Sequence, residues 1–439
     1  MAYETRSYMP EWLSDKGAVN EVLFCTEFLK EHPMKFVEGK FVSVDGILAM
    51  DAVRSMIGKM MLPYVSTGFA RKVKSAAEAL QYICRSDKPG CCRDEIHVRN
   101  GILKTSGRFI PEKRFCVNRL NVVYDEKDHL KPAVFLRFLS DMLDDDDILT
   151  LQEYLGYCLI PSTKGQAMMF IIGNGGEGKS RIGVVMKEIF GEGMIESKLH
   201  RIESDRFARA NLQNKLLMID DDMQLEALTS TGYIKNLVTA ETPVDIEIKG
   251  QQSFQAEIYA RFLCFSNGSP KALYDRTEGL GRRLIILTTK PVPKDRKTDR
   301  YIAEKMIEEK DRIFRWMFEG LQRLIANNFC FTISDKAKEN VSDMMSDNCN
   351  VIDFLKETSL VSFGADKQIS SMDLYESYKD WCEVNALTPL KRDTLVSWLK
   401  SNQDRYAIRY DCNVKSYGRR VRGFVGLYAL RAAYKTYGV

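Results

Sequence analysis

The sequence predicts an α/β protein of several domains, built around a parallel sheet that carries a phosphate-binding loop. From Gln166 to Leu287, short apolar runs alternate with helical patterns, which is typical of such a sheet. A glycine-rich segment follows the first of these runs, as phosphate loops do. The length of 439 residues favours about three domains, and the 45% hydrophobic and 28% charged residues exclude a wholly disordered or fibrous chain.

Composition also limits the location and the partners. The longest apolar runs fall far short of the roughly 18 residues that a membrane helix needs, so no membrane partner is expected. The first residues, Met1–Arg6, lack the pattern of a signal peptide, and we therefore expect the cytoplasm. The net charge of +4 names no partner, but from Lys391 onward 11 basic residues accompany only three acidic ones, which favours nucleic acid.

The 11 cysteines are odd in number and irregularly spaced, so reduced thiols are expected. One cluster, formed by Cys84, Cys91, Cys92 and His97, leaves a zinc site open as an alternative. The cluster lacks a clean C-x2-C pair, which makes the metal the less favoured interpretation.

The segment before the sheet mixes strand and helix patterns. Residues Glu38–Gly46 predict a hairpin, and Met50–Met61 predicts a helix. Two amphipathic helices are predicted over Ala133–Leu143 and Ile148–Leu159. The four acids Asp144–Asp147 between them suit a helix start better than a metal site, because carboxylates there accept free N–H groups and face the positive end of the dipole.

Four buried strands are predicted in the central region, namely Met168–Ile172, Lys215–Ile219, Phe262–Phe265 and Leu284–Leu287. A helical stretch over Tyr301–Asn328 follows them, and the polar segment Ser334–Asn350 indicates a linker. The last part predicts helices at Val351–Thr358, Ser371–Asn385 and Thr388–Ser401, and then a β pair at Tyr406–Tyr410 and Val421–Tyr428.

The most specific motif fits G-x-x-x-x-G-K-[ST] and lies between a predicted strand and a predicted helix. Glycines let backbone N–H groups turn toward phosphates, and the start of the helix adds positive potential. The lysine can reach the β- and γ-phosphates of ATP, and the serine hydroxyl can hold Mg²⁺. The candidate nucleotide-binding residues are Gly173, Asn174, Gly175, Gly176, Glu177, Gly178, Lys179 and Ser180.

Polar side chains end two of the other strands. After Lys215–Ile219 come three acids, of which we assign Asp220 to Mg²⁺ and Asp221 to the attacking water as general base, with Asp222 open as an alternative base. Asn267 ends the next strand, where its amide can orient that water.

Two adjacent arginines, Arg282 and Arg283, precede the last strand. In an oligomeric ATPase, an arginine from a neighbouring subunit can stabilise charge in the transition state. The sequence does not decide which of the two has this role.

These motifs, in this order, resemble those of the superfamily 3 helicases, and more closely the helicase part of phage and plasmid primase-helicases of the D5/P4 type. The resemblance rests on Gly173–Ser180, Leu216–Asp221, Thr239–Lys249, Leu263–Asn267 and Gly281–Arg283. Segments outside this region, Asn100–Leu103, Leu151–Tyr157 and Tyr378–Cys382, are similar to the N-terminal and C-terminal parts of the same family.

The resemblance implies an AAA+ P-loop ATPase core with a mainly helical N-terminal domain and a C-terminal winged helix. The implied boundaries are 1–145 for the D5-like region, 146–335 for the ATPase domain, 336–349 for a linker and 350–439 for the winged helix. It also implies a helicase that forms a ring of six subunits, hydrolyses ATP with Mg²⁺ at the subunit interfaces, and moves 3′ to 5′ along DNA.

In the family, a β-hairpin carries a lysine that grips DNA in the central channel. The implied DNA-binding residues of this chain are Lys249 of that hairpin and Arg392, Arg419, Arg420 and Arg422 of the winged helix. Gly250 stands where some viral relatives have a histidine. No primase motif is present, so a separate primase or polymerase is an expected partner. Two alternatives stay open: an origin-binding initiator with little unwinding, and a packaging or remodelling ATPase.

Overall fold

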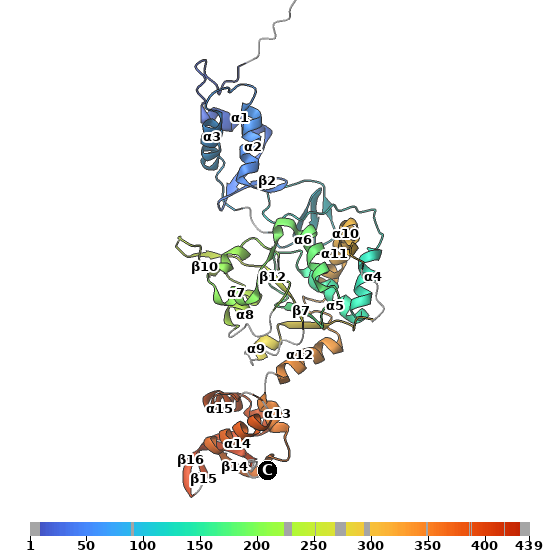
Figure 1. Cartoon of the computed structure of the whole chain (residues 1–439), viewed down its shortest axis with the longest axis vertical. Coiled ribbons are helices and arrows are strands. Elements are labelled where there is room, and N and C mark those ends of the chain that lie inside the picture. Colours follow the sequence, from blue (N-terminus) through green and yellow to red (C-terminus); the bar gives the residue numbers. More distant parts are fainter. Residues whose placement is uncertain are drawn as a thin grey trace, which may run out of the picture. The chain divides into compact units, whose positions relative to one another are not determined.

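The computed structural model divides into two compact units, the first reaching Asn340 and the second beginning at Val341 (Figure 1). The structure describes residues 9–88, 92–223, 231–250, 252–267, 278–293, 299–347, 350–385, 387, 389–416 and 418–430.

The N-terminal part of the first unit packs three helices with a small antiparallel sheet. Its elements are α1 (Glu21–Glu31), β1 (Met34–Val37), β2 (Lys40–Ser43), β3 (Gly46–Leu48), α2 (Met50–Met61) and α3 (Phe69–Ile83). Trp12, Phe24 and Phe28 are buried in its core. The predicted hairpin is confirmed by the antiparallel pairs of β2 with β1 and β3, and the predicted helix Met50–Met61 is confirmed as α2.

A second antiparallel sheet and three long helices lead into the centre of the unit. They are β4 (Glu95–Val98), β5 (Gly101–Lys104), β6 (Phe109–Ile110), α4 (Ala133–Met142), α5 (Asp145–Tyr157) and α11 (Lys310–Ala326). Helices α5 and α11 approach very closely, because a Cβ atom on Gly156 would lie 2.3 Å from the Met317 carbonyl oxygen. Only glycine permits this contact.

The four acids do mark a helix start, as predicted, because Asp144 is the N-cap of α5 and the other three form its first turn, but their side chains have different partners. Asp144 is the N-cap residue, yet its side chain makes no capping hydrogen bond and instead pairs with Lys336 and Lys290. Asp147 is buried and accepts a hydrogen bond from the Ser334 hydroxyl at 2.5 Å, and burial raises the pKa of its carboxyl.

The core of the first unit is a five-stranded sheet in the order β13-β7-β12-β9-β8. All four neighbouring pairs are parallel. The strands are β7 (Met168–Gly173), β8 (Met194–Glu196), β9 (Leu217–Asp220), β12 (Arg261–Asn267) and β13 (Leu284–Thr288). The four predicted strands are confirmed, and β8 is an additional short edge strand. The predicted α/β core with a parallel sheet is therefore present.

Shorter elements surround this sheet. They are α6 (Lys179–Phe190), α7 (Leu199–Ser204), α8 (Gly232–Thr239), β10 (Val244–Ile246), β11 (Phe254–Ala256), α9 (Glu278–Gly281) and α10 (Ile302–Glu308), with single 3-10 turns at Gly191–Gly193 and Ala208–Leu212. The polar segment predicted as a linker, 336–349, is helical over most of its length, as α12 (Asp335–Asp347). Its apolar residues Ala337 and Met344 are both buried, which favours a helix over an extended linker.

The second unit combines helices with a three-stranded antiparallel sheet of order β14-β16-β15. Its elements are α13 (Asn350–Lys356), β14 (Val361–Ser370), α14 (Ser371–Val384), α15 (Arg392–Ser401), α16 (Gln403–Tyr406), β15 (Arg409–Ser416) and β16 (Arg419–Ala429). The helices predicted at Val351–Thr358 and Ser371–Asn385 and the second predicted strand are confirmed. The third predicted helix is present but begins at Arg392 rather than at Thr388, which lies outside the described residues. The first predicted strand is wrong in its start, because Tyr406 ends a helical turn and the strand begins at Arg409.

Within the part of the chain that the structure describes, no helix has both the length and the apolar character that crossing a bilayer requires.

Candidate functional site

The glycine-rich motif forms a loop between a buried strand and a helix, in the context that the sequence predicted. Strand β7 is buried along its whole length and ends at Gly173, and α6 begins at Lys179. Gly175, Gly176 and Gly178 have φ angles of 101°, 85° and 103°, in a region that side chains disfavour. The loop conformation therefore requires glycine at these three positions.

The donors of this loop converge on one anionic group, the carboxylate of Glu177. Its Oε1 accepts hydrogen bonds from the backbone N–H groups of Asn174 at 2.5 Å and Gly175 at 2.8 Å. Its Oε2 accepts a hydrogen bond from Lys179 Nζ at 2.7 Å. Burial alone would raise the pKa of Glu177, but the hydrogen bonds from Lys179 and the backbone outweigh burial and lower it. The loop is thus arranged to hold negative charge.

The strand beside β7 brings Asn267 to the same place. Strand β12 pairs with β7 so that Asn267 lies directly opposite Gly173. Asn267 Oδ1 accepts a hydrogen bond from Lys179 Nζ at 3.1 Å. Two motifs 88 residues apart therefore meet at one ammonium group, at the carboxyl ends of the parallel strands, where open α/β sheets bind their ligands.

A cavity of about 1020 Å³ opens beside the loop, large enough for a nucleotide. Its polar wall combines the phosphate loop with acids and arginines, whereas its apolar wall comes from α4, α10 and the segment after β13. Beyond the loop itself, it is lined by Val134, Arg137, Phe138, Asp141, Arg181, Asp221, Asp222, Phe265, Ser266, Asn267, Val292, Asp299, Ile302 and Lys305.

The three acids at the end of β9 have different surroundings. Asp220 is only 2% exposed and does not line the cavity. Its Oδ2 accepts a hydrogen bond from the Leu199 N–H at 2.8 Å, and its Oδ1 accepts one from Lys198 Nζ at 3.1 Å. Asp221 and Asp222 are exposed and line the cavity. The assignment of Asp220 to the metal stays a prediction, while the geometry favours its two neighbours for that task.

The residues around the loop suit a hydrated Mg²⁺ ion. Ser180, Asp221 and Asp222 all line the cavity, and they offer a hydroxyl and two carboxylates. Mg²⁺ prefers hard oxygen ligands, retains several waters and is held through one or two carboxylates plus substrate phosphates. The donor set therefore fits a metal that arrives with a polyphosphate.

The two arginines lie away from the loop of their own chain. In the parallel pair of β13 with β7, Leu284 is opposite Met168, at the start of β7. The loop follows the other end of β7, five residues or roughly 17 Å further along the strand. Arg282 is exposed, and Arg283 donates a hydrogen bond to the Gly279 carbonyl oxygen. An arginine at this end of the sheet is poorly placed to reach phosphates in its own loop.

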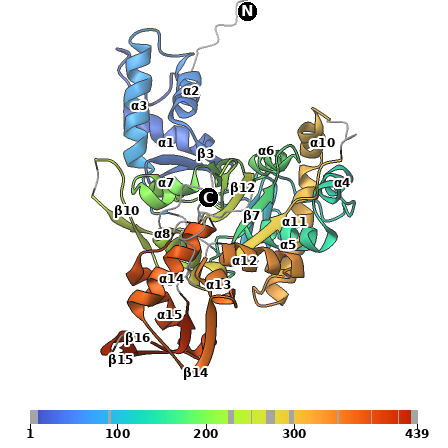
Figure 2. The ribbon, with the colours of Figure 1, turned by 60° about the horizontal axis from the view of Figure 1, so that its bottom comes forward.

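The predicted hairpin is present as the antiparallel pair β10–β11. Figures 1 and 2 show it standing out from the sheet on the side of α7 and α8. Lys249 lies exposed in the turn, next to Gly250, whose φ of 80° suits glycine. A lysine at this tip can extend its charge into the surroundings without contacting the rest of the unit.

The basic residues predicted to bind DNA in the second unit are all exposed. Arg392 begins α15, and Arg419, Arg420 and Arg422 lie on β16 next to the turn that follows β15. Their role in binding DNA stays a prediction.

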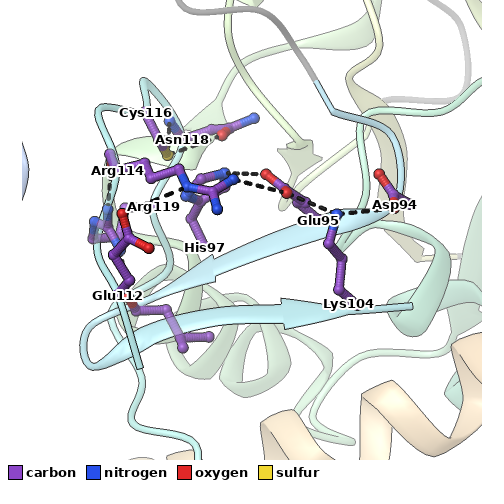
Figure 3. A network of polar contacts seen from close by, with 10 residues as sticks. Asp94, Glu95, His97, Lys104, Glu112, Arg114, Cys116, Asn118 and Arg119 are labelled. Atoms are coloured by element: carbon purple, nitrogen blue, oxygen red, sulfur yellow. Dashed lines mark hydrogen bonds and ion pairs between the residues drawn. The ribbon is translucent and has the colours of Figure 1, made fainter. Parts of the chain in front are cut away.

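The zinc site left open as an alternative at Cys84, Cys91, Cys92 and His97 is not assembled among the residues that the structure describes, and Cys91 lies outside them. Cys84 is buried among helices and donates a hydrogen bond from Sγ to the Leu80 carbonyl oxygen. His97 instead lies in a network of charged groups, with its Nε2 3.5 Å from a carboxylate oxygen of Glu95 (Figure 3). Burial lowers the pKa of His97 to about 4.

Sequence reasoning missed the residues that form the other wall of the cavity. Arg181 directly follows the G-K-S motif, a position that could have been noticed. Arg137 and Asp141 lie on α4, far before the loop in sequence, and no motif marks them. Lys198, which pairs with Asp220, likewise carries no sequence signal.

Comparison with known families finds that residues 171–283 match a family of unknown function, DUF5906. The match spans the phosphate loop, the acids, the hairpin, Asn267 and the two arginines. Comparison with curated proteins finds no match. Among solved structures, the chain is similar to the apo structure of the NrS-1 C-terminal region, with 12% identity, a TM-score of 0.49, and coverage of 92% of this chain and 99% of that one. Two A-form apo structures of the same region have TM-scores of 0.48, with 12% and 13% identity.

Proposed function

We propose that this chain is an ATP hydrolase that works as a ring-forming DNA helicase, moving 3′ to 5′ along one strand in the replication of a phage or another mobile genetic element. The proposal combines the order of the motifs, and the helicase family that they resemble, with the geometry of the site. The observation that carries it is the convergence of the Lys179 ammonium, the loop N–H groups, Asn267 and two acids on one nucleotide-sized cavity.

Each group has a task in this mechanism. The loop N–H groups and Lys179 hold the phosphates, and they stabilise charge that develops during phosphoryl transfer. Ser180 and one of the exposed acids, Asp221 or Asp222, hold Mg²⁺, and the other acid accepts a proton from the attacking water. Asn267 orients that water. ATP, when bound with Mg²⁺, supplies the transferable phosphoryl group.

The distance of Arg282 and Arg283 from their own loop supports a ring of subunits. An arginine that cannot reach its own phosphates can reach those of a neighbour if the subunits pack head to tail. A closed ring of six, as in the family that the motifs resemble, would give every site such an arginine. Each site would then be complete only in the assembled ring.

The exposed hairpin suits a grip on DNA. A lysine contacts phosphate oxygens whatever the base sequence, so movement along the strand would be independent of sequence and would weaken with salt. The exposed arginines of the second unit offer a second, duplex-binding surface, and a separate primase or polymerase would make the primers.

The test is strand displacement on a forked DNA, measured with ATP and with a non-hydrolysable analogue, together with the mass of the assembly. We expect a ring that unwinds the fork only with ATP, and Lys179→Ala should abolish hydrolysis. A chain that stays monomeric with ATP and DNA, or that hydrolyses ATP undiminished without Lys179, would refute the proposal.

The exposed arginines on β16 favour one alternative, an initiator that assembles on duplex DNA with little unwinding. The same fork assay separates the two functions. An initiator would bind the duplex and form a ring with either nucleotide, but it would displace little DNA even when ATP is hydrolysed.

A further inference from the structure

We propose that Glu177 is an internal competitor of the nucleotide: its carboxylate holds the phosphate-binding donors in the empty protein, and a nucleotide must displace it to bind. The proposal rests on the proposed function, because it concerns the same loop. The pattern G-x-x-x-x-G-K-[ST] accepts any residue at position 177. The proposal gives the glutamate found there a role in setting the affinity for nucleotide.

The contacts of Glu177 show what it occupies. Two backbone N–H groups of the loop and the ammonium of Lys179 all donate to its two carboxylate oxygens, at 2.5 to 2.8 Å. These are the groups that the motif provides for phosphate. A carboxylate and a phosphate are both anions that accept from such donors, and each backbone N–H donates fully to one acceptor at a time.

The position of the side chain makes this competition direct. Glu177 is only 3% exposed, and it lines the cavity together with the glycines that flank it. A phosphate group close enough to accept from Asn174 N and Lys179 Nζ would therefore meet the carboxylate, and the two negative charges would repel each other. One of them has to leave.

The loop can release the carboxylate. Gly175, Gly176 and Gly178 flank Glu177, and glycine backbones rotate at little steric cost. The cavity beside the loop is open to solvent, so the displaced carboxylate can be hydrated. The empty state is thus satisfied internally, and the apparent affinity for nucleotide falls by the fraction of molecules in which the donors are free.

The experiment measures the dissociation constant of a non-hydrolysable ATP analogue with Mg²⁺, by titration calorimetry, for the full chain and for Glu177→Ala. Removing the competitor should tighten binding about tenfold, since charged hydrogen bonds no longer have to be broken. Glu177→Gln keeps the size of the side chain but loses its charge, and it should fall between the two. Glu188→Ala is the matched control, because it removes one exposed carboxylate from helix α6, which follows the loop, without touching the loop itself.

Thermal unfolding gives a second readout. Without nucleotide, Glu177→Ala should melt below the unchanged chain, because the buried Lys179 ammonium loses its carboxylate partner and keeps only the Asn267 amide oxygen. Saturating nucleotide should raise the melting temperature of Glu177→Ala by more than that of the unchanged chain. If Glu177 only stiffens the loop, Glu177→Ala binds nucleotide equally or more weakly, and the competitor role is refuted. If neither the unchanged chain nor its variants bind the nucleotide, the proposed function itself fails, and the inference fails with it.

Discussion

Separate substitutions of Asp220 and Asp221, at the end of β9, distinguish a carboxylate that stabilises the fold from one that takes part in ATP hydrolysis. Asp220 is 2% exposed and accepts hydrogen bonds from the Leu199 N–H and from Lys198 Nζ. In Asp220→Asn, the new NH₂ group faces one of these two donors, so one buried hydrogen bond is lost and two donors oppose each other. We expect the free energy of unfolding to fall by about 2–3 kcal/mol, the cost of an unsatisfied buried group.

Asp221→Asn should have the opposite effects, with little change in stability and a large loss of ATP hydrolysis. Asp221 is exposed and lines the cavity, so Asp221→Asn should change the free energy of unfolding by no more than about 0.5 kcal/mol. It should lower the rate of ATP hydrolysis about 10²–10⁴-fold, the range for loss of a general base. Asp222→Asn is the third variant, because the two exposed acids can exchange roles.

Urea unfolding, followed by circular dichroism, and release of phosphate from ATP measure the two effects. Stability of Asp220→Asn equal to that of the unchanged chain would refute the structural role. Full hydrolysis by both Asp221→Asn and Asp222→Asn would show that neither exposed acid takes part in the chemistry.

Three further predictions concern other parts of the first unit. Lys249→Ala should leave basal ATP hydrolysis unchanged, because the hairpin lysine does not line the cavity, but it should reduce unwinding of the fork. Unwinding equal to that of the unchanged chain would show that other residues bind the DNA strand. His97, with a pKa near 4, stays neutral while the unfolded chain gains a proton below about pH 6.5, so the free energy of unfolding should fall by up to about 3 kcal/mol as the pH drops from 6.5 to 4. In urea titrations between pH 4 and 6.5, the free energy of unfolding of His97→Gln should depend less on pH than that of the unchanged chain. An unchanged pH dependence would contradict a lowered pKa of His97. Gly156→Ala should lower the melting temperature by several degrees, since its Cβ would meet the backbone of α11 at 2.3 Å; an unchanged melting curve would show that the helices can separate without cost.

The sheet could be predicted from the sequence because its strands are buried on both faces and read as continuous apolar runs. Strand β8 was not predicted, because it has only three residues and lies at the edge of the sheet, where it is partly exposed and shows no continuous apolar run. The helical conformation of α12 was not predicted because its composition is polar, although Ala337 and Met344 are spaced two turns apart and are both buried. Short or mostly exposed elements carry too few apolar residues to show a period.

The candidate site was predictable where the chemistry is local. The loop, Asn267 and the acids follow strands directly, and parallel strands bring their carboxyl ends together. The orientation of Asp220 was not predictable, because its partners Lys198 and Leu199 lie more than 20 residues earlier in sequence. The occupation of the loop by Glu177 depends on the folded geometry of three glycines, which spacing alone does not reveal.

The buried position of Asp220 links the candidate site to the hairpin. Asp220 ends β9 and accepts from the first N–H of α7, while Glu203 near the other end of α7 accepts from Ile234 N at 2.9 Å, in the first turn of α8. Strand β10 of the hairpin follows α8 after a few residues. The end of β9 and the segment that carries Lys249 are therefore connected through two short helices that buried carboxylates join. Asp220 faces inward because its carboxylate accepts hydrogen bonds from Leu199 N and Lys198 Nζ, which fix the start of α7 against the end of the strand.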